Sequence, residues 1–522
     1  MPRGRKGAKA LGLAVALSLL TTCATNLNGY STAASSSSNL EERTAVVFDA
    51  IKTDPNFLRV FLREMPKGGD LHNHLSGTPY AEEFLDWAAA RDFCVNPEAL
   101  TLAPPPCNPS SSVPVRDLIS RDDDLYDRMI DTMSARPLVT GKPSPLNGHQ
   151  QFFGSFTKFF PISSLEQGKS LASSRRAASD DNVLYQELMY NPASIGAFAM
   201  GGASENWSGD FAAELEALRP TLPDLVSRAR TDASSTETEA IETLGCEATP
   251  DSKGCEIEVR YNCFGLRLIP EPALFRQLAQ CFALIEADPR FFGVSLVQPE
   301  DHPIAIKQYD RHMEMIAFFK SEFPSAHITL HAGELTLGLV PPDALRDHIK
   351  KAIHIAGSER IGHGVDIAYE DNSRETLAHM ADHGIAVEVN LSSNAVILGI
   401  EGSDHPFNLY RAAGVPTVLS TDDLGVLRSD MTQQYVMAAR DHDLDYLELK
   451  TLSRNSLHYA FLPGSSLWDN ASYDAYVEDC QAPETNRCEA FLNANEKAAL
   501  EFELEQRFAD FEADFADWTL RP

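Results

Sequence analysis

Eight short β-rich runs, each followed by helix-like sequence, predict an α/β fold: a (β/α)8 TIM barrel with helical insertions and a C-terminal helical extension. The count of eight matches such a barrel, and the polar residues of these runs cluster at their C-terminal ends, where TIM barrels carry their active sites. The runs are residues 69–75, 182–190, 255–264, 291–297, 327–333, 360–367, 385–392 and 415–422.

The segment before the first run predicts export. Residues 1–22 combine a basic start, an apolar run over 10–20 and a polar end, which is typical of a signal peptide and too short for a permanent membrane helix. The sequence ending in Cys23 resembles a bacterial lipoprotein cleavage box, although Thr22 replaces the usual small residue. We expect lipidation of Cys23, with ordinary signal cleavage as the alternative. The serine-rich residues 23–39 are predicted to be a flexible tether.

Residues 40–522 are predicted to form a single barrel domain with insertions near 95–150 and 200–255. The first insertion holds a proline-rich loop and an aromatic segment. The polar stretch 230–255 in the second is interpreted as a loop. Residues 496–518 are acidic and aromatic, and predict an amphipathic closing helix.

Charge and cysteine content narrow the class of protein. The formal net charge of −31 disfavours binding to nucleic acid, whose phosphates it would repel. An exported chain can form disulfides, and proximity suggests three pairs, whereas Cys263 and Cys281 lie in apolar runs and are interpreted as free core thiols. The three pairs are Cys94 with Cys107, Cys246 with Cys255, and Cys480 with Cys488.

Four polar residues at strand ends have the chemistry of a metal site. His72 and His74 are two apart in a strand, so both can point into the barrel mouth. His331 ends the fifth run and Asp422 ends the eighth. Three imidazoles and a carboxylate make a plausible zinc shell with an open position for water.

Two further residues could perform the chemistry beside such a metal. His363, between two glycines, could orient or deprotonate a metal-bound water, and Glu334 could carry a proton. Each motif alone also suits a strand end, a turn or a helix cap. Their joint placement on runs one, five, six and eight is what favours an active site.

These motifs resemble a known series. PKGGDLHNHLSG, NVLYQELMYNP, TLHAGE, ERIGHG, LSSN and STDDLGV occur in the order found in the adenosine deaminase family of metal-dependent amidohydrolases. The resemblance runs from about Leu40 to Tyr459. The opening MPKGGDLHNH and the secretory start are also similar to the secreted, growth-factor-related branch, although HLSG is closer to the ordinary deaminase pattern.

The resemblance implies a role for each residue. Glu334 would protonate the purine N1 while zinc hydroxide attacks C6, and His363 would steer that hydroxide. Asp423 would hydrogen-bond the purine N7, and Gly333 would also contact the substrate. One Zn²⁺ per chain would be bound by His72, His74, His331 and the catalytic Asp422.

Two positions depart from the family pattern. Ser76 replaces an aspartate that contacts ribose in many members, and Gln298 replaces a glycine that meets the purine N3. Both are predicted substrate contacts that put nucleoside selectivity in doubt. The aromatic segment (Phe152, Phe153, Phe156, Phe159 and Phe160) is either a lid over the ribose or a core helix. Asn394 either braces the metal site or is a turn residue.

Together these observations predict an exported zinc-dependent purine nucleoside aminohydrolase acting on adenosine or 2′-deoxyadenosine, located in the periplasm or on a membrane through Cys23, and otherwise secreted. The alternatives are a deaminase of adenine or of a modified adenosine, and a non-catalytic zinc-binding signalling protein. AMP is disfavoured because the motifs bring no cluster of arginine or lysine. Expected partners are a small purine substrate and, only through a lipid on Cys23, a membrane.

Overall fold

The barrel predicted from the sequence is present in the computed structural model, which describes residues 33–200 and 207–518. All eight predicted strands form, and they pair in parallel in chain order, which confirms the fold class. Parallel strands covered by helices are buried on both sides, and β5 and β7 are buried throughout. The barrel strands are β1 (Gly68–His74), β5 (Val183–Met189), β6 (Glu258–Leu266), β7 (Phe291–Val297), β8 (His327–Ala332), β9 (Arg360–His363), β10 (Ala386–Val389) and β11 (Thr417–Leu419).

The barrel closes where its first strand meets the segment after its last. Asn73 and Asp422 form a parallel bridge. The Asp422 amide donates to the His72 carbonyl at 2.9 Å, and the His74 amide donates to the Asp422 carbonyl at 3.1 Å. The closing seam therefore runs directly through three of the predicted metal ligands.

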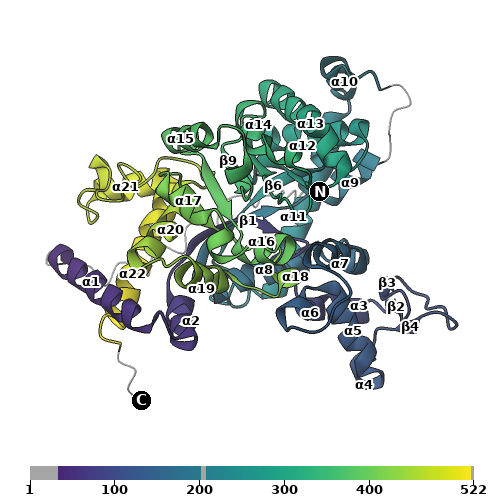
Figure 1. Cartoon of the computed structure of the whole chain (residues 1–522), viewed down its shortest axis with the longest axis horizontal. Coiled ribbons are helices and arrows are strands. Elements are labelled where there is room, and N and C mark those ends of the chain that lie inside the picture. Colours follow the sequence, from purple (N-terminus) through teal and green to yellow (C-terminus); the bar gives the residue numbers. More distant parts are fainter. Residues whose placement is uncertain (1–32, 201–206, 519–522) are drawn as a thin grey trace, which may run out of the picture.

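Helices surround this barrel and extend it at both ends (Figure 1). The helices that precede β5 to β11 are, in chain order, α8 (Gln167–Asp180), α11 (Leu222–Leu244), α12 (Glu271–Ala287), α13 (Pro303–Glu322), α14 (His348–His354), α15 (Ser373–His383) and α17 (Phe407–Ala412). The others at the ends and in the loops are α1 (Ala33–Ile51), α2 (Pro55–Glu64), α9 (Ala193–Met200), α10 (Phe211–Leu218), α16 (Leu391–Leu398), α18 (Leu424–Leu427), α19 (Met431–Asp441), α20 (Tyr446–His458), α21 (Asn486–Ala494) and α22 (Glu496–Phe515).

The first predicted insertion forms a small structure of its own beside the barrel (Figure 1). A three-stranded sheet packs with helices around a second apolar core, which includes Phe84, Met129 and Phe159. These elements are β2 (Cys94–Asn96), β3 (Thr101–Ala103), β4 (Val113–Pro114), α3 (Ala81–Ala90), α4 (Leu118–Arg121), α5 (Asp123–Met133), α6 (Arg136–Val139) and α7 (Gly148–Ser163).

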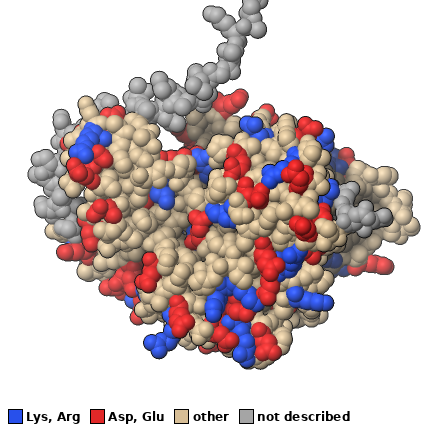
Figure 2. Space-filling model, turned by 90° about the horizontal axis from the view of Figure 1, so that it is seen from above, with Lys and Arg blue, Asp and Glu red and all other residues tan. Residues whose placement is uncertain are grey.

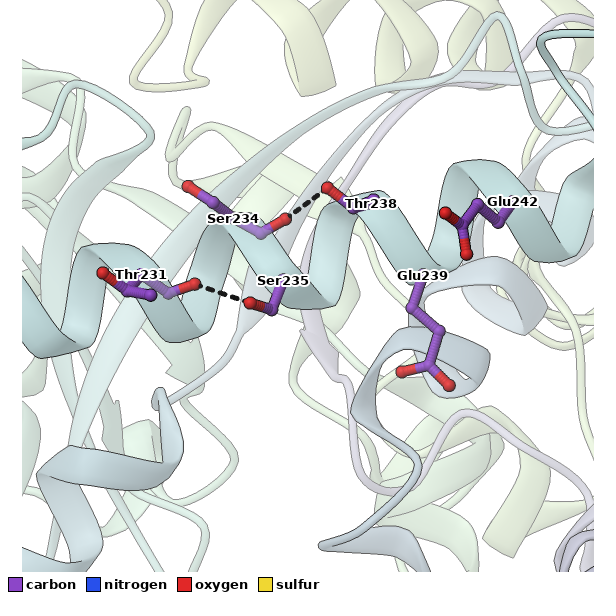
Figure 3. Close-up of a pocket in the computed structure, with 6 residues that line it drawn as sticks. All are labelled: Thr231, Ser234, Ser235, Thr238, Glu239 and Glu242. Carbon is purple, nitrogen blue, oxygen red and sulfur yellow. Dashed lines mark hydrogen bonds between the residues drawn. The ribbon is translucent and has the colours of Figure 1, made fainter.

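The loop predicted over 230–255 is wrong for most of its length. Residues 222–244 form α11, a crossover helix between β5 and β6. Its buried face begins with Leu222 and Val226 and continues with smaller residues, which are Ala229, Ala233, Thr236 and Ala240. The hydroxyl groups that suggested a loop donate to carbonyl oxygens one turn back in the helix, as from Ser235 to Thr231 at 3.0 Å (Figure 3). Together with Glu239 and Glu242, these hydroxyl residues line a shallow groove of about 350 Å³.

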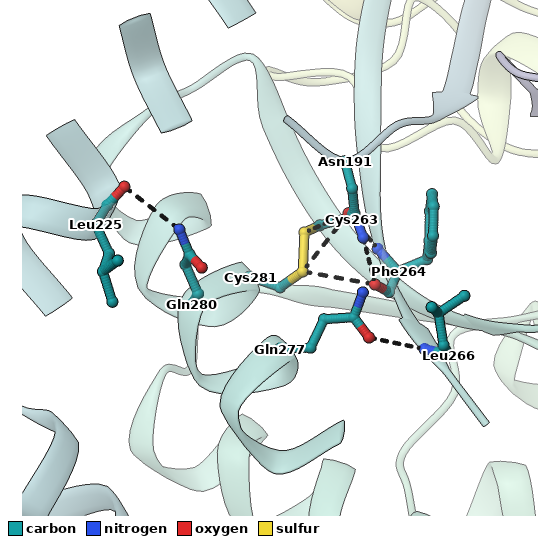
Figure 4. The surroundings of a disulfide bond; sticks show 8 residues. All are labelled: Asn191, Leu225, Cys263, Phe264, Leu266, Gln277, Gln280 and Cys281. Carbon is teal, nitrogen blue, oxygen red and sulfur yellow. Dashed lines mark hydrogen bonds between the residues drawn. A yellow bond between two sulfur atoms is a disulfide. The ribbon is translucent and has the colours of Figure 1, made fainter. Parts of the chain in front are cut away.

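The described part of the chain contains four disulfides, of which three are those suggested by proximity. The interpretation of Cys263 and Cys281 as free thiols is wrong, because they are bonded to each other (Figure 4). One lies on β6 and the other on α12, which follows it. The side chain of Asn191 accepts from the Phe264 amide at 3.0 Å beside this bond.

The predicted signal peptide and residues 23–32 lie outside the described residues. The tether prediction is wrong for 33–39, since α1 begins at Ala33. This helix ends on the apolar core through Phe48 and Ile51. The closing helix is confirmed as α22, which buries Leu504 and Phe508.

Charges of both signs are interspersed over the face shown in Figure 2. The excess of acidic residues therefore forms no single uninterrupted patch there. Within the residues described, no helix is both long and apolar enough to cross a membrane.

Candidate metal centre and active site

The four predicted ligands converge at the C-terminal mouth of the barrel. One ligand atom from each of His72, His74, His331 and Asp422 lies within 4.8 Å of the others. Nε2 of His331 lies 3.0 Å from Nε2 of His72 and 3.1 Å from Nε2 of His74. Oδ1 of Asp422 lies 3.1 Å from Nε2 of His74. Three ring nitrogens and one carboxylate oxygen thus face one point.

The remaining polar atoms of three ligands are held by neighbours. Nδ1 of His72 lies 2.6 Å from the Glu388 carboxylate, and Nδ1 of His331 lies 3.1 Å from the Ser295 hydroxyl. The Ser393 hydroxyl donates to Oδ2 of Asp422 at 2.6 Å. Such partners fix the ring orientation and leave Nε2 facing a metal.

Glu388 is itself part of a buried charged network. Its other oxygen accepts from Thr329 at 2.6 Å and from the Arg360 guanidinium at 2.7 Å. Arg360 also pairs with Glu187. Burial opposes ionisation, but Arg360 and His72 outweigh it and lower the pKa of Glu388 to about 2. The carboxylate behind His72 is therefore held in its charged form.

The site backbone contains several uncommon conformations. His363 has φ 68° and Asp422 has φ 59°, values in the left-handed region that non-glycine residues seldom adopt. Gly362 lies close to a ligand, because a Cβ there would come within 2.7 Å of Cε1 of His72. Left-handed backbone held by a packed barrel is typical of functional sites.

Glu334 follows β8 and is buried in the mouth. Its amide, and that of Gly333, donate to the Glu300 carboxylate at 2.9 and 3.1 Å. Burial, reinforced by the Asp422 carboxylate, raises the pKa of Glu334 well above its usual value. A carboxyl kept protonated in this way can serve as a proton donor.

The electrostatics of the ligand set favour one positive charge. Burial and the neighbouring imidazoles lower the pKa of His331 well below its usual value. Burial also acts to lower that of His74, but Asp423 and Asp422 outweigh it and raise the pKa of His74 to about 9. The pocket thus stabilises a cation beside the Asp422 carboxylate, whose own pKa is lowered, despite burial, by His74. Stabilising a cation is the property required of a metal site.

The loops after β1 and β11 interlock beside this site. Oδ1 of Asp423 is buried and has no hydrogen-bond partner among the described residues. A Cβ on Gly77 would overlap that same carboxylate, so glycine is required for the close approach. Burial raises the pKa of Asp423 well above its usual value. Ser76, the next residue back, is exposed.

Gln298 adopts φ 83°, a conformation suited to the glycine expected there. Its Oε1 accepts from the Leu268 amide at 3.0 Å, which fixes the side chain against the loop after β6.

The aromatic segment forms helix α7. Phe152 and Phe159 are buried in the second core, whereas Phe160 is 63% exposed, so the core interpretation holds for the two buried rings. The start of the helix nevertheless reaches the barrel mouth. Nε2 of His149 lies 2.9 Å from Oδ1 of Asp301, which is in the loop between β7 and α13.

Sequence reasoning missed the residues behind the ligands. Glu388 left a signal, since it is the one charge within the apolar run 385–392. Ser295 left none, because serines are common in any chain, and Ser393 was present only as an unassigned member of the LSSN motif. Their roles depend on which strands and loops become neighbours.

Comparisons with known proteins find relatives among deaminases. A family model described as adenosine deaminase matches residues 222–467. An adenosine deaminase of Pectobacterium atrosepticum is 34% identical over 152 residues, which are 28% of this chain and 42% of that protein. An aminodeoxyfutalosine deaminase of Streptomyces avermitilis is 36% identical over 133 residues, 25% of this chain and 34% of that protein. The matched stretches thus span less than half of these relatives.

Solved structures share the fold over most of the chain. A crystal structure of an Arabidopsis N6-mAMP deaminase has a TM-score of 0.50 and 19% identity, and covers 85% of this chain and 99% of its own. The Arabidopsis ADAL protein complexed with IMP has a TM-score of 0.51 and 18% identity, and covers 86% and 99%. Over residues 222–467 the chain is thus similar to the adenosine deaminase family, and it shares the fold of these solved structures.

Proposed function

We propose that this chain is a zinc-dependent purine nucleoside aminohydrolase, which converts adenosine or 2′-deoxyadenosine to inosine or 2′-deoxyinosine and ammonia. The observation that carries the proposal is the convergence of His72, His74, His331 and Asp422 with the buried acid Glu334 in one barrel mouth. A merely structural metal would have no use for a protonated carboxyl beside it.

The donor set fits zinc. Three imidazole nitrogens and one carboxylate oxygen are ligands that Zn²⁺ prefers. His72, His74, His331 and Asp422 would hold the ion, which when bound activates water as a nucleophile at neutral pH.

The other residues act on the purine ring. Attack at C6 places electrons on N1, and Glu334 delivers a proton to that nitrogen. N7 can only accept a hydrogen bond, so the Asp423 carboxyl must donate one and thereby orient the ring. The Glu300 carboxylate holds Glu334 in place through its backbone amide. Ser76 and Gln298 would adjust selectivity for the sugar and the purine edge.

Ammonia release by the purified, zinc-loaded chain tests this function. The substrates are adenosine, 2′-deoxyadenosine, adenine and AMP, with Glu334→Gln as the control. We expect preferential turnover of the two nucleosides, which the variant abolishes. Turnover of adenine or a modified adenosine instead would mean that the chain is a purine deaminase with a different substrate. No turnover of any purine with zinc bound would favour the non-catalytic signalling alternative.

We also propose export, with a lipid on Cys23 as the anchor. The signal-like residues 1–22 support it, and so do the four disulfides, which persist in oxidising compartments. Mass spectrometry of the N-terminal peptide from the native host should find an acylated Cys23. An unmodified new N-terminus would instead indicate ordinary signal cleavage and secretion.

A further inference from the structure

A buried chain of hydrogen bonds leads from a backbone amide to His363. The Phe407 amide lies 3.1 Å from Nδ1 of His405, and Nε2 of His405 lies 3.0 Å from Oδ1 of Asn394. Nδ2 of Asn394 lies 3.0 Å from Nδ1 of His363. All three side chains are buried, so water does not compete with these contacts.

The first bond determines the direction of the next. A backbone amide can only donate, so Nδ1 of His405 must accept and must be free of hydrogen. The single hydrogen of the neutral His405 ring is then on Nε2. Burial lowers the pKa of His405 to about 3, which keeps the ring neutral.

The donor and acceptor roles at His405 then fix the orientation of the Asn394 side-chain amide. Because Nε2 of His405 donates, it must face the amide oxygen, as it does. The amide nitrogen is left facing His363, and an amide nitrogen can only donate. The Asn390 amide nitrogen lies 3.4 Å from the same Nδ1 and adds a second donor. The lone pair of Nδ1 on His363 is therefore occupied.

We propose that Phe407, His405 and Asn394 fix His363 as the neutral tautomer with its hydrogen on Nε2, so that His363 acts as a hydrogen-bond donor and not as a base. This inference rests on the proposed function for its consequence, but not for the tautomer itself. Asn394 and His405 are then positioning residues.

The tautomer decides between the two roles that the sequence left open for His363. With Nδ1 occupied and Nε2 carrying hydrogen, the ring has no free lone pair to take a proton from water. It can still hold an oxygen atom near C6 by donating a hydrogen bond. Its ring centroid lies 4.9 Å from that of His72 and 5.2 Å from that of His331, beside the metal ligands.

Nitrogen NMR of the zinc-loaded chain labelled with ¹⁵N-histidine tests the tautomer directly. The His363 signals are those that disappear in His363→Gln, while His383→Gln, at an exposed histidine, identifies signals unrelated to the site. We expect Nδ1 of His363 without hydrogen and Nε2 with it. A hydrogen on Nδ1, with or without one on Nε2, would overturn the proposal. The measurement needs no turnover, so it stays informative if the purine substrate is wrong.

Asn394→Asp tests what sets the tautomer. A carboxylate can only accept, so it should move the His363 hydrogen to Nδ1 and lower kcat by about 100-fold, with little change in KM. Asn408→Asp adds the same charge at an exposed site in the neighbouring helix and should change neither quantity. If His363 kept its hydrogen on Nε2 in Asn394→Asp, the hydrogen-bond chain would not be what sets it. A moved hydrogen with unchanged kcat would exclude the donor role.

Discussion

The ligand side and the substrate side of the barrel mouth are built differently. On the ligand side, His72, His331 and Asp422 each have a neighbour on the atom that faces away from the metal position. On the substrate side, Oδ1 of Asp423 has no hydrogen-bond partner among the described residues, and Oε1 of Glu334 lies 3.9 Å from Nδ1 of His363, beyond hydrogen-bonding distance.

This difference indicates that the metal position is built for a permanently bound ion and the other side for a ligand that comes and goes. Side chains with satisfied partners are oriented before any ion arrives, as a resident metal requires. A buried polar atom without a partner costs about 1–3 kcal/mol, and a bound ligand that supplies the partner recovers this free energy. The unpaired Oδ1 of Asp423, beside the metal ligands, therefore marks where a transient substrate would bind.

Removing a ligand should break the ligand side completely. We expect His331→Ala to lose the metal and all measurable turnover, because the remaining donors no longer enclose the ion. Metal analysis after gel filtration, together with ammonia release, checks this. His383→Ala, at an exposed histidine, should keep both. Full metal content in His331→Ala would show that the ion is bound elsewhere.

Removing the acid should affect only the substrate side. Glu334→Gln retains the shape but has no proton to donate, so we expect a fall in kcat of about 10²- to 10⁴-fold with full metal content. The same two assays separate it from the ligand variant. A variant that stays active would mean that another group protonates the ring.

Weakening the support behind a ligand should have an intermediate effect. Glu388→Gln removes the charge that orients His72, and we expect metal affinity to fall about 10- to 100-fold, measured by competition with a chelator. Glu375→Gln loses an equal charge at the exposed start of α15 and should bind metal normally. Equal affinities in the two variants would argue against a role for the partner of Nδ1.

The smallest effect is expected from the interlocked loops. Gly77→Ala should displace Asp423 and raise KM for adenosine by about 10-fold, with metal content unchanged. Gly154→Ala is the matched control, since a Cβ there meets nothing within 4 Å. A KM equal in both variants would show that Asp423 does not orient the ring.

The sequence predicted the barrel because its strands are continuous apolar runs, and such runs can be recognised without knowing which segments they pack against. It also placed all four converging ligands, since each ends such a run. The prediction failed at α11, because several of its buried residues are small alanines interspersed with serines and threonines, and this part of the sequence shows no clear apolar pattern. The pairing of Cys263 with Cys281 was missed because it depends on how α12 packs on β6. Asn394 and His405 became informative only when their hydrogen bonds were known.

The closing seam has a consequence for assembly of the protein. Asn73 and Thr421, which hydrogen-bond at that seam, are 348 residues apart in the chain. The metal position therefore does not exist until the last strand has joined the first, and contacts so distant in sequence form late and slowly. An ion bound there would stabilise the closed barrel, since its binding free energy adds to that of folding. The metal content of a preparation would then measure the fraction of chains with a closed barrel. Fragments ending before Asp422 would lack both the metal position and the stability that the ion supplies.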